Sequence, residues 1–260
     1  MAWFLGVDVG SVTTKAVVTK DNELVAYQTM PSGSNYKIAA ERVVTEALAK
    51  AGLSSEDIAY AVSTGYGANN VAIASQQVTD ISCCARGVSR LFPSVRTIIE
   101  VGGQASKVIR VSSEGRAINF AVSERCAAGS GRFLQIIARV LQIDIKDVGP
   151  LSLQAKNPVT YTTGCAVFGE SEAVSRVAEG AAKEDILAGV HNALAAKISN
   201  LIDQVGLEED CAITGGGALD VGLIMRVEEK LGVHLVVPPQ PQITAALGAA
   251  LVAAERPVAP

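Results

Sequence analysis

The chain has 260 residues and a formal net charge of −4, and 49% of its residues are hydrophobic while only 4% are aromatic. This length suits one large domain or two small, similar ones, and the composition favours helices packed on sheets. Because the sequence has no basic run, no apolar stretch of membrane length and no signal-peptide pattern, we expect no nucleic-acid partner, no membrane span and a cytoplasmic location.

The first part of the chain alternates between apolar runs and helical patterns. The opening apolar run, Trp3–Val9, is typical of a buried strand and is broken at Gly10. A segment with apolar residues at helical spacing follows and ends at Gly52, a residue that commonly terminates helices. In chain order we expect strands at 3–9, 16–19, 23–30 and 59–63, and helices at 38–51 and 80–90.

The second part of the chain repeats the opening pattern of a strand, a glycine turn and a returning strand. We expect strands at 96–101, 107–111, 211–214 and 234–237, and helices at 129–141, 170–179, 186–205, 221–231 and 245–254. This alternation of strands and helices predicts an α/β fold.

Two segments of the chain resemble each other. The segment 7–15 aligns without a gap with the segment 99–107, and the alignment places Asp8 on Glu100. It also matches one glycine and one lysine of each segment. Such self-similarity indicates duplicated units, although two unrelated hairpins of similar composition would give the same pattern.

Three glycine-rich turns follow predicted strands and indicate a phosphate-binding site. Glycine allows the backbone to approach a phosphate and to direct N–H groups toward it. Each turn taken alone is more typical of an ordinary structural turn, since none is a P-loop or a dinucleotide fingerprint. Two acidic residues at strand ends, Asp8 and Glu100, suit a catalytic role in holding hydrated Mg²⁺ or positioning water. The expected nucleotide-binding residues are Gly10, Ser11, Thr13, Thr14, Lys15, Gly102, Gly103, Gln104, Gly215, Gly216 and Gly217.

This order of turns resembles the superfamily of actin, sugar kinases and heat-shock ATPases. The resemblance places a phosphate-1 loop at 8–15, a phosphate-2 loop at 100–103 and an adenosine loop at 215–217. It implies two duplicated actin-like (ribonuclease H-like) halves, with ATP or ADP and Mg²⁺ in a cleft between them. We expect these halves to be 1–94 and 95–260, with the C-terminal half carrying the cysteines discussed next.

Two of the five cysteines suit a metal site. Cys126 and Cys165 lie in glycine-rich loops before predicted helices, where N–H groups and the helix dipole favour thiolates. Small neighbouring residues leave room for an iron–sulfur cluster. Two cysteines do not complete a four-thiolate set, so a second chain would have to supply two more. The alternative is a pair of ordinary loop thiols, whereas Cys211, inside an apolar strand, is typical of a structural thiol.

The sequences around these cysteines resemble a specific family. The segments 124–133 and 162–172 are similar to those of the activators of 2-hydroxyacyl-CoA dehydratases and of the related ATPase subunits of benzoyl-CoA reductase. The resemblance extends from Gly6 to Ala253 and includes the segment 64–67. It implies that Cys126 and Cys165 hold one 4Fe-4S cluster shared between two subunits.

The resemblance implies an ATP-hydrolysing iron–sulfur electron donor for a CoA-thioester dehydratase or a benzoyl-CoA-type reductase. Its partners would be a second copy or paralogous subunit, the iron–sulfur dehydratase or reductase component, and a ferredoxin or flavodoxin. The alternatives are a small-molecule (sugar) kinase of the same superfamily and a non-catalytic nucleotide-sensing subunit. The chain departs from the family at Glu100 and Ala105, where aspartate is usual. These departures suggest slow ATP turnover or a place in a heteromeric pair.

Overall fold

The structure is a computed structural model that describes residues 2–123, 129–161 and 166–256, without the side chains of residues 166 and 167. Its contacts divide the chain into two units. Unit 1 comprises Met1–Val95, Val111–Ile118 and Pro238–Pro260, and unit 2 comprises Arg96–Arg110 and Asn119–Val237. The division into halves at residues 94 and 95 stays a prediction, and each unit is described by itself below.

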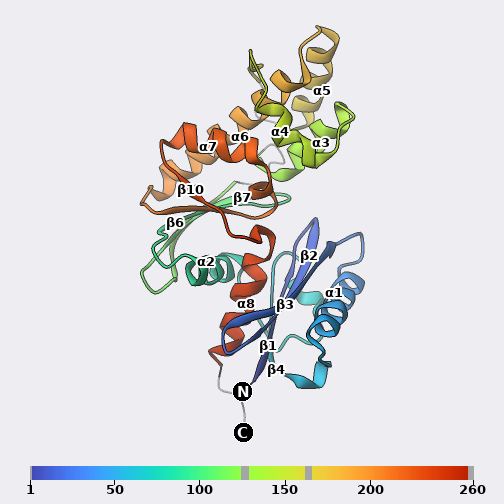
Figure 1. Cartoon of the computed structure of the whole chain (residues 1–260), viewed down its shortest axis with the longest axis vertical. Coiled ribbons are helices and arrows are strands. Elements are labelled where there is room, and N and C mark those ends of the chain that lie inside the picture. The colour runs from blue at the N-terminus through green and yellow to red at the C-terminus, as the bar shows by residue number, and fades with distance from the viewer. Residues whose placement is uncertain (1, 124–128, 162–165, 257–260) are drawn as a thin grey trace. The chain divides into compact units, whose positions relative to one another are not determined.

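Unit 1 is built on a five-stranded sheet with the strand order β3-β2-β1-β4-β5 (Figure 1). Strands β1, β2 and β3 form an antiparallel meander, while β4 pairs in parallel with both β1 and β5. The strands are β1 (Trp3–Val9), β2 (Thr13–Lys20), β3 (Glu23–Pro31), β4 (Ile58–Thr64) and β5 (Gln76–Gln77). The helices are α1 (Tyr36–Ala51), α2 (Asp80–Leu91) and α8 (Thr244–Ala254).

The local sequence explains where the first helix begins and ends. The side chain of Asn35 caps α1 by accepting a hydrogen bond from the Ile38 N–H, and Gly52 ends the helix in the left-handed conformation. The buried face of α1 packs on β1, β2 and β3. This side of the sheet forms one apolar core of unit 1, with Leu5, Val7, Val18 and Val43 among its buried residues.

Helix α8 is almost entirely apolar, and nearly all of its residues are buried. It packs against β1 and α2 (Figure 1). Three glycines make the closest of these contacts possible. A Cβ atom at Gly6 would lie 2.0 Å from the Ala246 carbonyl oxygen. The contact with α2 is reciprocal, because a Cβ at Gly87 would meet the Thr244 carbonyl oxygen and a Cβ at Gly248 would meet that of Cys83. The backbones therefore approach too closely for any side chain at these three positions.

Unit 2 contains the second five-stranded sheet, with the strand order β10-β9-β6-β7-β8 (Figure 1). Strand β6 pairs antiparallel with β7 and in parallel with β9. Read from its other end, this order repeats that of the first sheet. The strands are β6 (Thr97–Val101), β7 (Ser106–Val111), β8 (Ala117–Val122), β9 (Cys211–Thr214) and β10 (Leu235–Val236).

The helices of unit 2 share one apolar core with this sheet. The longest of them, α6, is buried along one side, and its apolar residues join those of β6, β7 and β9 in a single core. The helices are α3 (Gly131–Val140), α4 (Val148–Ser152), α5 (Ala166–Ala178), α6 (Lys183–Val205) and α7 (Val221–Leu231).

The α/β class expected from the sequence is confirmed, with a mixed sheet in each unit. Most predicted elements lie within a few residues of the observed ones, and the predicted bounds of β9 and α7 match. The sequence analysis missed β5, β8 and α4. Among the residues that the structure describes, no helix combines the length and the apolar character that crossing a membrane requires.

Candidate functional site

The first predicted phosphate loop is the tight hairpin between β1 and β2. Asp8 and Lys15 are opposite each other in this antiparallel pair, and Lys15 Nζ lies 2.9 Å from Asp8 Oδ2. Both side chains are about nine-tenths buried, with 10% and 11% exposed. The hairpin therefore holds a buried ion pair that fixes the position of both side chains.

The turn of this hairpin is held by a residue from a later segment. The Gly10 N–H donates to the Thr13 carbonyl oxygen, and a Cβ at Gly10 would lie 2.7 Å from that oxygen. Ser32 Oγ donates to the Gly10 carbonyl oxygen at 2.6 Å and lies 2.8 Å from Thr14 Oγ1. Thr14 is fully buried, whereas Ser11 and Thr13 are partly exposed. Sequence reasoning missed Ser32, because it is far along the chain and belongs to no motif.

The loop that follows β4 packs beside Asp8. Thr64, at the end of β4, is the parallel partner of Asp8, and Gly65 follows with a φ of +87°. A Cβ at Gly65 would lie 2.3 Å from Asp8 Oδ1 and 2.8 Å from the Val9 carbonyl oxygen. The Gly67 N–H donates to that same oxygen at 2.8 Å. The segment 64–67, which the sequence analysis mentioned without a role, therefore packs against the first predicted phosphate loop.

Unit 2 repeats this geometry at the second predicted phosphate loop. Glu100 and Lys107 are opposite each other on β6 and β7, and Lys107 Nζ lies 2.5 Å from Glu100 Oε2. The Gly102 N–H donates to the Ala105 carbonyl oxygen at 2.9 Å. Gly215 has a φ of +84°, and a Cβ there would lie 2.5 Å from the Val101 carbonyl oxygen.

The predicted binding residues therefore fall into two groups. The structure brings Glu100, the turn at Gly102 and Gly103, and the turn at Gly215–Gly217 together within unit 2. Gln104 is exposed at the tip of the phosphate-2 turn. The residues from Asp8 to Lys15 form the other group, within unit 1. Their assignment to nucleotide binding stays a prediction.

The phosphate-2 turn is hydrogen-bonded to the start of α3. The Gly131 N–H donates to the Gly102 carbonyl oxygen at 2.9 Å, and the Arg132 N–H donates to the Gly103 carbonyl oxygen at 3.1 Å. These are N–H groups of the first turn of a helix, which have no partner inside the helix itself. In addition, Ser106 Oγ donates to the Gly129 carbonyl oxygen at 2.5 Å. Hydrogen bonds thus hold the phosphate-2 turn and the start of α3 together.

The two predicted cluster ligands, Cys126 and Cys165, lie outside the described residues. Helix α3 begins five residues after Cys126, and α5 begins directly after Cys165. The two helices contact each other within unit 2. Within residues 2–123, 129–161 and 166–256, no group of three or more His, Cys, Asp and Glu side chains is placed to hold a metal ion.

Three cysteines are buried in the described part of the chain: Cys83, Cys84 and Cys211. Burial, together with the negative charges of Asp8 and Asp80, raises the pKa of the Cys83 thiol to about 12, against a smaller lowering by Thr64. Burial also raises the pKa of Cys211. A thiol with a raised pKa stays protonated at neutral pH and is a poor metal ligand. Cys211 is therefore structural, as expected from its strand.

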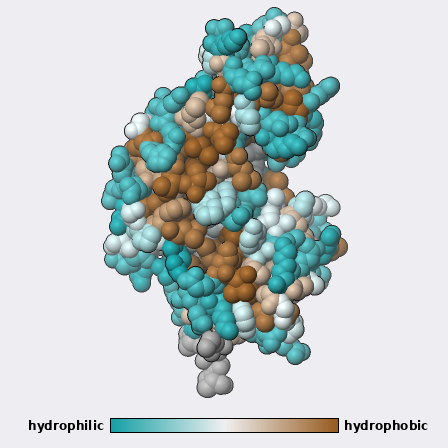
Figure 2. All heavy atoms as spheres, viewed as in Figure 1, coloured by the Kyte–Doolittle hydropathy of each residue, from teal (hydrophilic) through white to brown (hydrophobic). Residues whose placement is uncertain are grey.

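Helix α5 exposes large apolar side chains (Figure 2). Phe168 is 67% exposed, and Val174 and Val177 are each about half exposed. Ala173, one turn before Val177, is fully buried in the core of unit 2. Exposed apolar side chains gathered on one helix are typical of a surface that another molecule covers.

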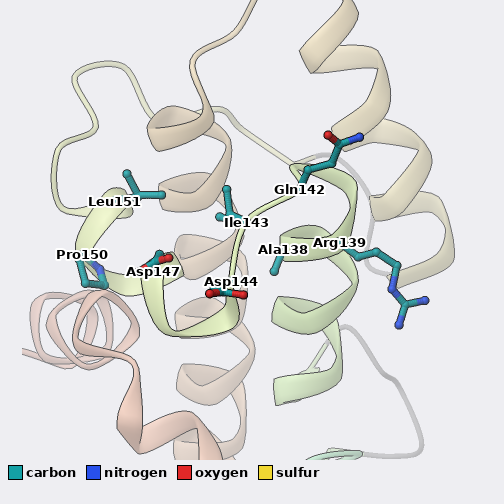
Figure 3. A pocket seen from close by; sticks show the side chains of 8 residues that line it. All are labelled: Ala138, Arg139, Gln142, Ile143, Asp144, Asp147, Pro150 and Leu151. Atoms are coloured by element: carbon teal, nitrogen blue, oxygen red, sulfur yellow. The ribbon is translucent and has the colours of Figure 1, made fainter.

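A pocket of about 760 Å³ opens between α3 and α4, and the predicted binding residues are not among those that line it (Figure 3). Its lining residues are Ala138, Arg139, Gln142, Ile143, Asp144, Asp147, Pro150 and Leu151. Asp144 forms an exposed ion pair with Lys146, and none of the phosphate-turn residues reaches the pocket. We therefore do not assign the nucleotide to this pocket.

Comparison with known families gives one match over nearly the whole chain. The model of the BadF/BadG/BcrA/BcrD ATPase family matches residues 5–253. This range includes both predicted phosphate hairpins, the predicted adenosine turn and the segments that carry Cys126 and Cys165.

Several named proteins are similar to the chain over their full length or most of it. The 2-hydroxyisocaproyl-CoA dehydratase activator of Clostridioides difficile is 39% identical, with 96% of this chain and 94% of that protein aligned. One of the benzoyl-CoA reductase subunits of Thauera aromatica is 33% identical, with 82% and 77% aligned. The crystal structure of component A of the Acidaminococcus fermentans (R)-2-hydroxyglutaryl-CoA dehydratase superposes with a TM-score of 0.93 at 38% identity, covering 97% and 98% of the two chains. This superposition confirms the expected fold class.

Proposed function

The chain belongs to the BadF/BadG/BcrA/BcrD ATPase family, and on this basis we propose that it is an ATP-driven, iron–sulfur electron donor. It would act in the cytoplasm on a CoA-thioester dehydratase or a benzoyl-CoA-type reductase. Relatives named as a dehydratase activator and as part of a reductase support this choice of partner. Electrons would come from a ferredoxin or flavodoxin.

The two phosphate hairpins support the ATPase part of the proposal. Each offers a glycine turn with backbone N–H groups, a carboxylate and a lysine, and these groups suit the phosphates and Mg²⁺ of ATP. Asp8 and Glu100 are the acidic residues, and each is held in place by the lysine opposite it. Held in this way, the carboxylates keep one orientation, which suits the ligands of a hydrated Mg²⁺ ion.

The single observation that carries the coupling is the pair of hydrogen bonds from α3 to the phosphate-2 turn. The N–H groups of Gly131 and Arg132 donate to the carbonyls of Gly102 and Gly103. A change in the conformation of the phosphate-2 turn on phosphate binding would therefore also displace the start of α3. Cys126 lies five residues before that helix. If the γ-phosphate of ATP binds at this turn, as we propose, these hydrogen bonds would connect it through few residues to the Cys126 segment.

The chemistry of the donor set fits a shared four-iron cluster. One chain supplies two thiolates, Cys126 and Cys165, and a 4Fe-4S cluster requires four. A second copy or a paralogous subunit would supply the remaining two. The exposed Phe168 and Val177 on α5, the helix that follows Cys165, suit burial against that second subunit. When bound, the cluster supplies one-electron transfer at a low potential.

We would first measure iron and acid-labile sulfide in protein purified without oxygen. We expect about two irons per chain, corresponding to one four-iron cluster per pair of subunits. Cys126→Ser should lose this iron. Cys211→Ala is the control and should keep the iron, because the Cys211 thiol is buried and donates to the Glu208 carbonyl oxygen.

The same preparation separates the proposal from its alternatives. Absence of iron in both the wild type and Cys211→Ala would contradict the electron-donor function. ATP-dependent phosphorylation of a sugar by such iron-free protein would then indicate a kinase, and ATP binding without hydrolysis would indicate a nucleotide sensor.

A further inference from the structure

We propose that His191, on α6, is a positioning residue for nucleotide binding and acts through Asp220. The inference rests on the proposed ATP-binding function and extends it to a side chain that belongs to no phosphate or adenosine motif. In this proposal, His191 holds the predicted adenosine turn, Gly215–Gly217, in the conformation that binds the nucleoside part of ATP or ADP.

Asp220 is hydrogen-bonded to His191, to α7 and to the predicted adenosine turn. Its Oδ2 lies 3.1 Å from His191 Nε2, while its Oδ1 accepts from the Leu223 N–H at 3.0 Å and so caps α7. The Asp220 N–H donates to the Gly217 carbonyl oxygen at 3.1 Å. A single residue thus joins α6, the first turn of α7 and the last glycine of the adenosine turn.

The pair is deeply buried, and the backbone around it leaves little free space. His191 is fully buried, and the Asp220 side chain is 9% exposed. A Cβ at Gly222, in the first turn of α7, would lie 2.8 Å from His191 Cε1 and 2.1 Å from Ser152 Oγ. A Cβ at Gly149, on α4, would lie 2.6 Å from Asp220 Oδ1. Helices α4, α6 and α7 therefore meet at this pair (Figure 1).

The second ring nitrogen of His191 indicates that the pair does more than stabilise the fold. Because a carboxylate oxygen only accepts, we assign Nε2 as the donor, which leaves Nδ1 as an acceptor. This Nδ1 is buried and has no hydrogen-bond partner among the residues that the structure describes. A buried acceptor without a partner costs free energy, and an apolar side chain would fill the same space without that cost. What the histidine adds is direction, because its one hydrogen bond orients the Asp220 carboxylate.

The two neighbours of Asp220 in the sequence are exposed apolar residues. Leu219 is 60% exposed and Val221 is 49% exposed, whereas the Asp220 side chain between them is buried. A nucleoside base has an apolar face, and exposed apolar side chains beside a glycine turn suit such a face. By holding Asp220 inward, His191 also fixes the outward orientation of both neighbours.

The test measures the dissociation constant of ADP by calorimetry and the kcat of ATP hydrolysis in the full chain. We expect His191→Ala to raise the Kd of ADP about tenfold, because the turn loses a hydrogen bond that holds its binding conformation. The kcat should change less than about twofold, since both phosphate hairpins keep their ion pairs. His191→Gln should restore most of the ADP affinity, because its amide N–H can still donate to Asp220.

Two control variants separate positioning from general damage to unit 2. Ile198→Ala removes buried apolar volume about two turns further along α6 and lowers the stability of the unit while leaving the pair in place. His234→Ala removes the other histidine of the chain, whose side chain is 84% exposed and lies 2.8 Å from Glu228 on α7. Both variants should keep the wild-type Kd for ADP.

An unchanged Kd in His191→Ala, or an equal rise in Ile198→Ala, would overturn the inference. If His191→Ala does not fold, His191→Phe takes its place, because it fills the space without a donor, and a wild-type Kd there overturns the inference. The proposed function fails differently, since wild-type protein without iron contradicts electron donation alone. Wild-type protein without affinity for ADP contradicts both. A tenfold rise of Kd in His191→Ala within iron-free protein would support the role of His191 while contradicting electron donation.

Discussion

The two phosphate hairpins have the same geometry and differ in what holds their turns. Asp8 and Lys15 in unit 1 correspond to Glu100 and Lys107 in unit 2, each pair facing across its hairpin. Glutamate still reaches its lysine, so the longer side chain preserves the ion pair. The departure from aspartate at position 100 therefore changes the position of the carboxylate and keeps its charge partner.

The correspondence extends to the next strand of each sheet. Thr64 lies opposite Asp8 and Thr214 lies opposite Glu100, and each threonine is followed by a glycine with positive φ. Each of these glycines packs against the strand that carries the acid. The duplication detected over nine residues thus includes a second loop in each unit.

The difference lies in the turn carbonyls. In unit 1 the Gly10 carbonyl accepts from the hydroxyl of Ser32, a contact that ends at a loop. In unit 2 the equivalent Gly102 carbonyl accepts from Gly131, the first residue of α3. The same turn is thus closed locally in one unit and connected to a helix near Cys126 in the other. The two duplicated turns therefore differ in whether a helix is hydrogen-bonded to them.

Removal of Asp8 or Glu100 should have the largest effect on stability and should differ between the two units. We expect Asp8→Ala to lower the free energy of unfolding by about 3–5 kcal/mol, since it leaves Lys15 buried without its partner. Glu100→Ala should lower it less, because Lys107 and Glu100 are more exposed, at 13% and 18%. Urea unfolding of both variants would measure this, and equal losses would contradict the difference in burial.

Alanine substitutions at Gly65 and Gly215 would test whether the two units pack these corresponding glycines equally tightly. Gly180 also has a positive φ but has open space around it, so Gly180→Ala measures backbone strain alone, about 1–2 kcal/mol. We expect Gly65→Ala and Gly215→Ala to cost about 2–5 kcal/mol, because each methyl group also meets a backbone carbonyl. Thermal unfolding would provide the values.

Activity distinguishes the two glycines further. The methyl group at position 65 would also displace the Asp8 carboxylate, so Gly65→Ala should lose ATP turnover at temperatures where it remains folded. If neither variant is less stable than Gly180→Ala, the close packing described here is wrong.

The smallest predicted difference between the units is the pH dependence of stability that each buried thiol contributes. The Cys83 thiol has a raised pKa of about 12 in the folded protein against an ordinary value of 9.0, so only the unfolded chain ionises near pH 9. Stability from this group is complete below pH 9 and falls as the pH rises toward 12. We expect the loss between pH 8 and pH 10 to be about 1 kcal/mol smaller in Cys83→Ala than in the wild type.

Unfolding by urea at the two pH values, under reducing conditions, would test this thiol. Cys211→Ala is the control from unit 2, and its change should be smaller because Cys211 is less completely desolvated. Identical pH dependence in the wild type and Cys83→Ala would contradict the assignment.

The sequence predicted structure best where residues close together in the chain determine it. Apolar periodicity located α7, and the matched acids and lysines located both hairpins, since cross-strand pairing follows from residue order. Ser32 escaped detection because its contact depends on how a distant loop folds back. Strand β8 was missed because its outward residues, Ile118 and Phe120, are apolar and hide the expected alternation.

Helix α8 has a consequence for the order in which the protein is made. It follows β1, α2 and the elements of unit 2 in the sequence, yet it covers β1 near Gly6 and packs on α2. While the rest of the chain is being synthesised, the α8-facing side of the first sheet is therefore exposed, including Phe4, Val17 and Val62. The segments of unit 2 lie between β1 and α8 in the sequence, so the nascent chain must protect this apolar face while all of them are synthesised.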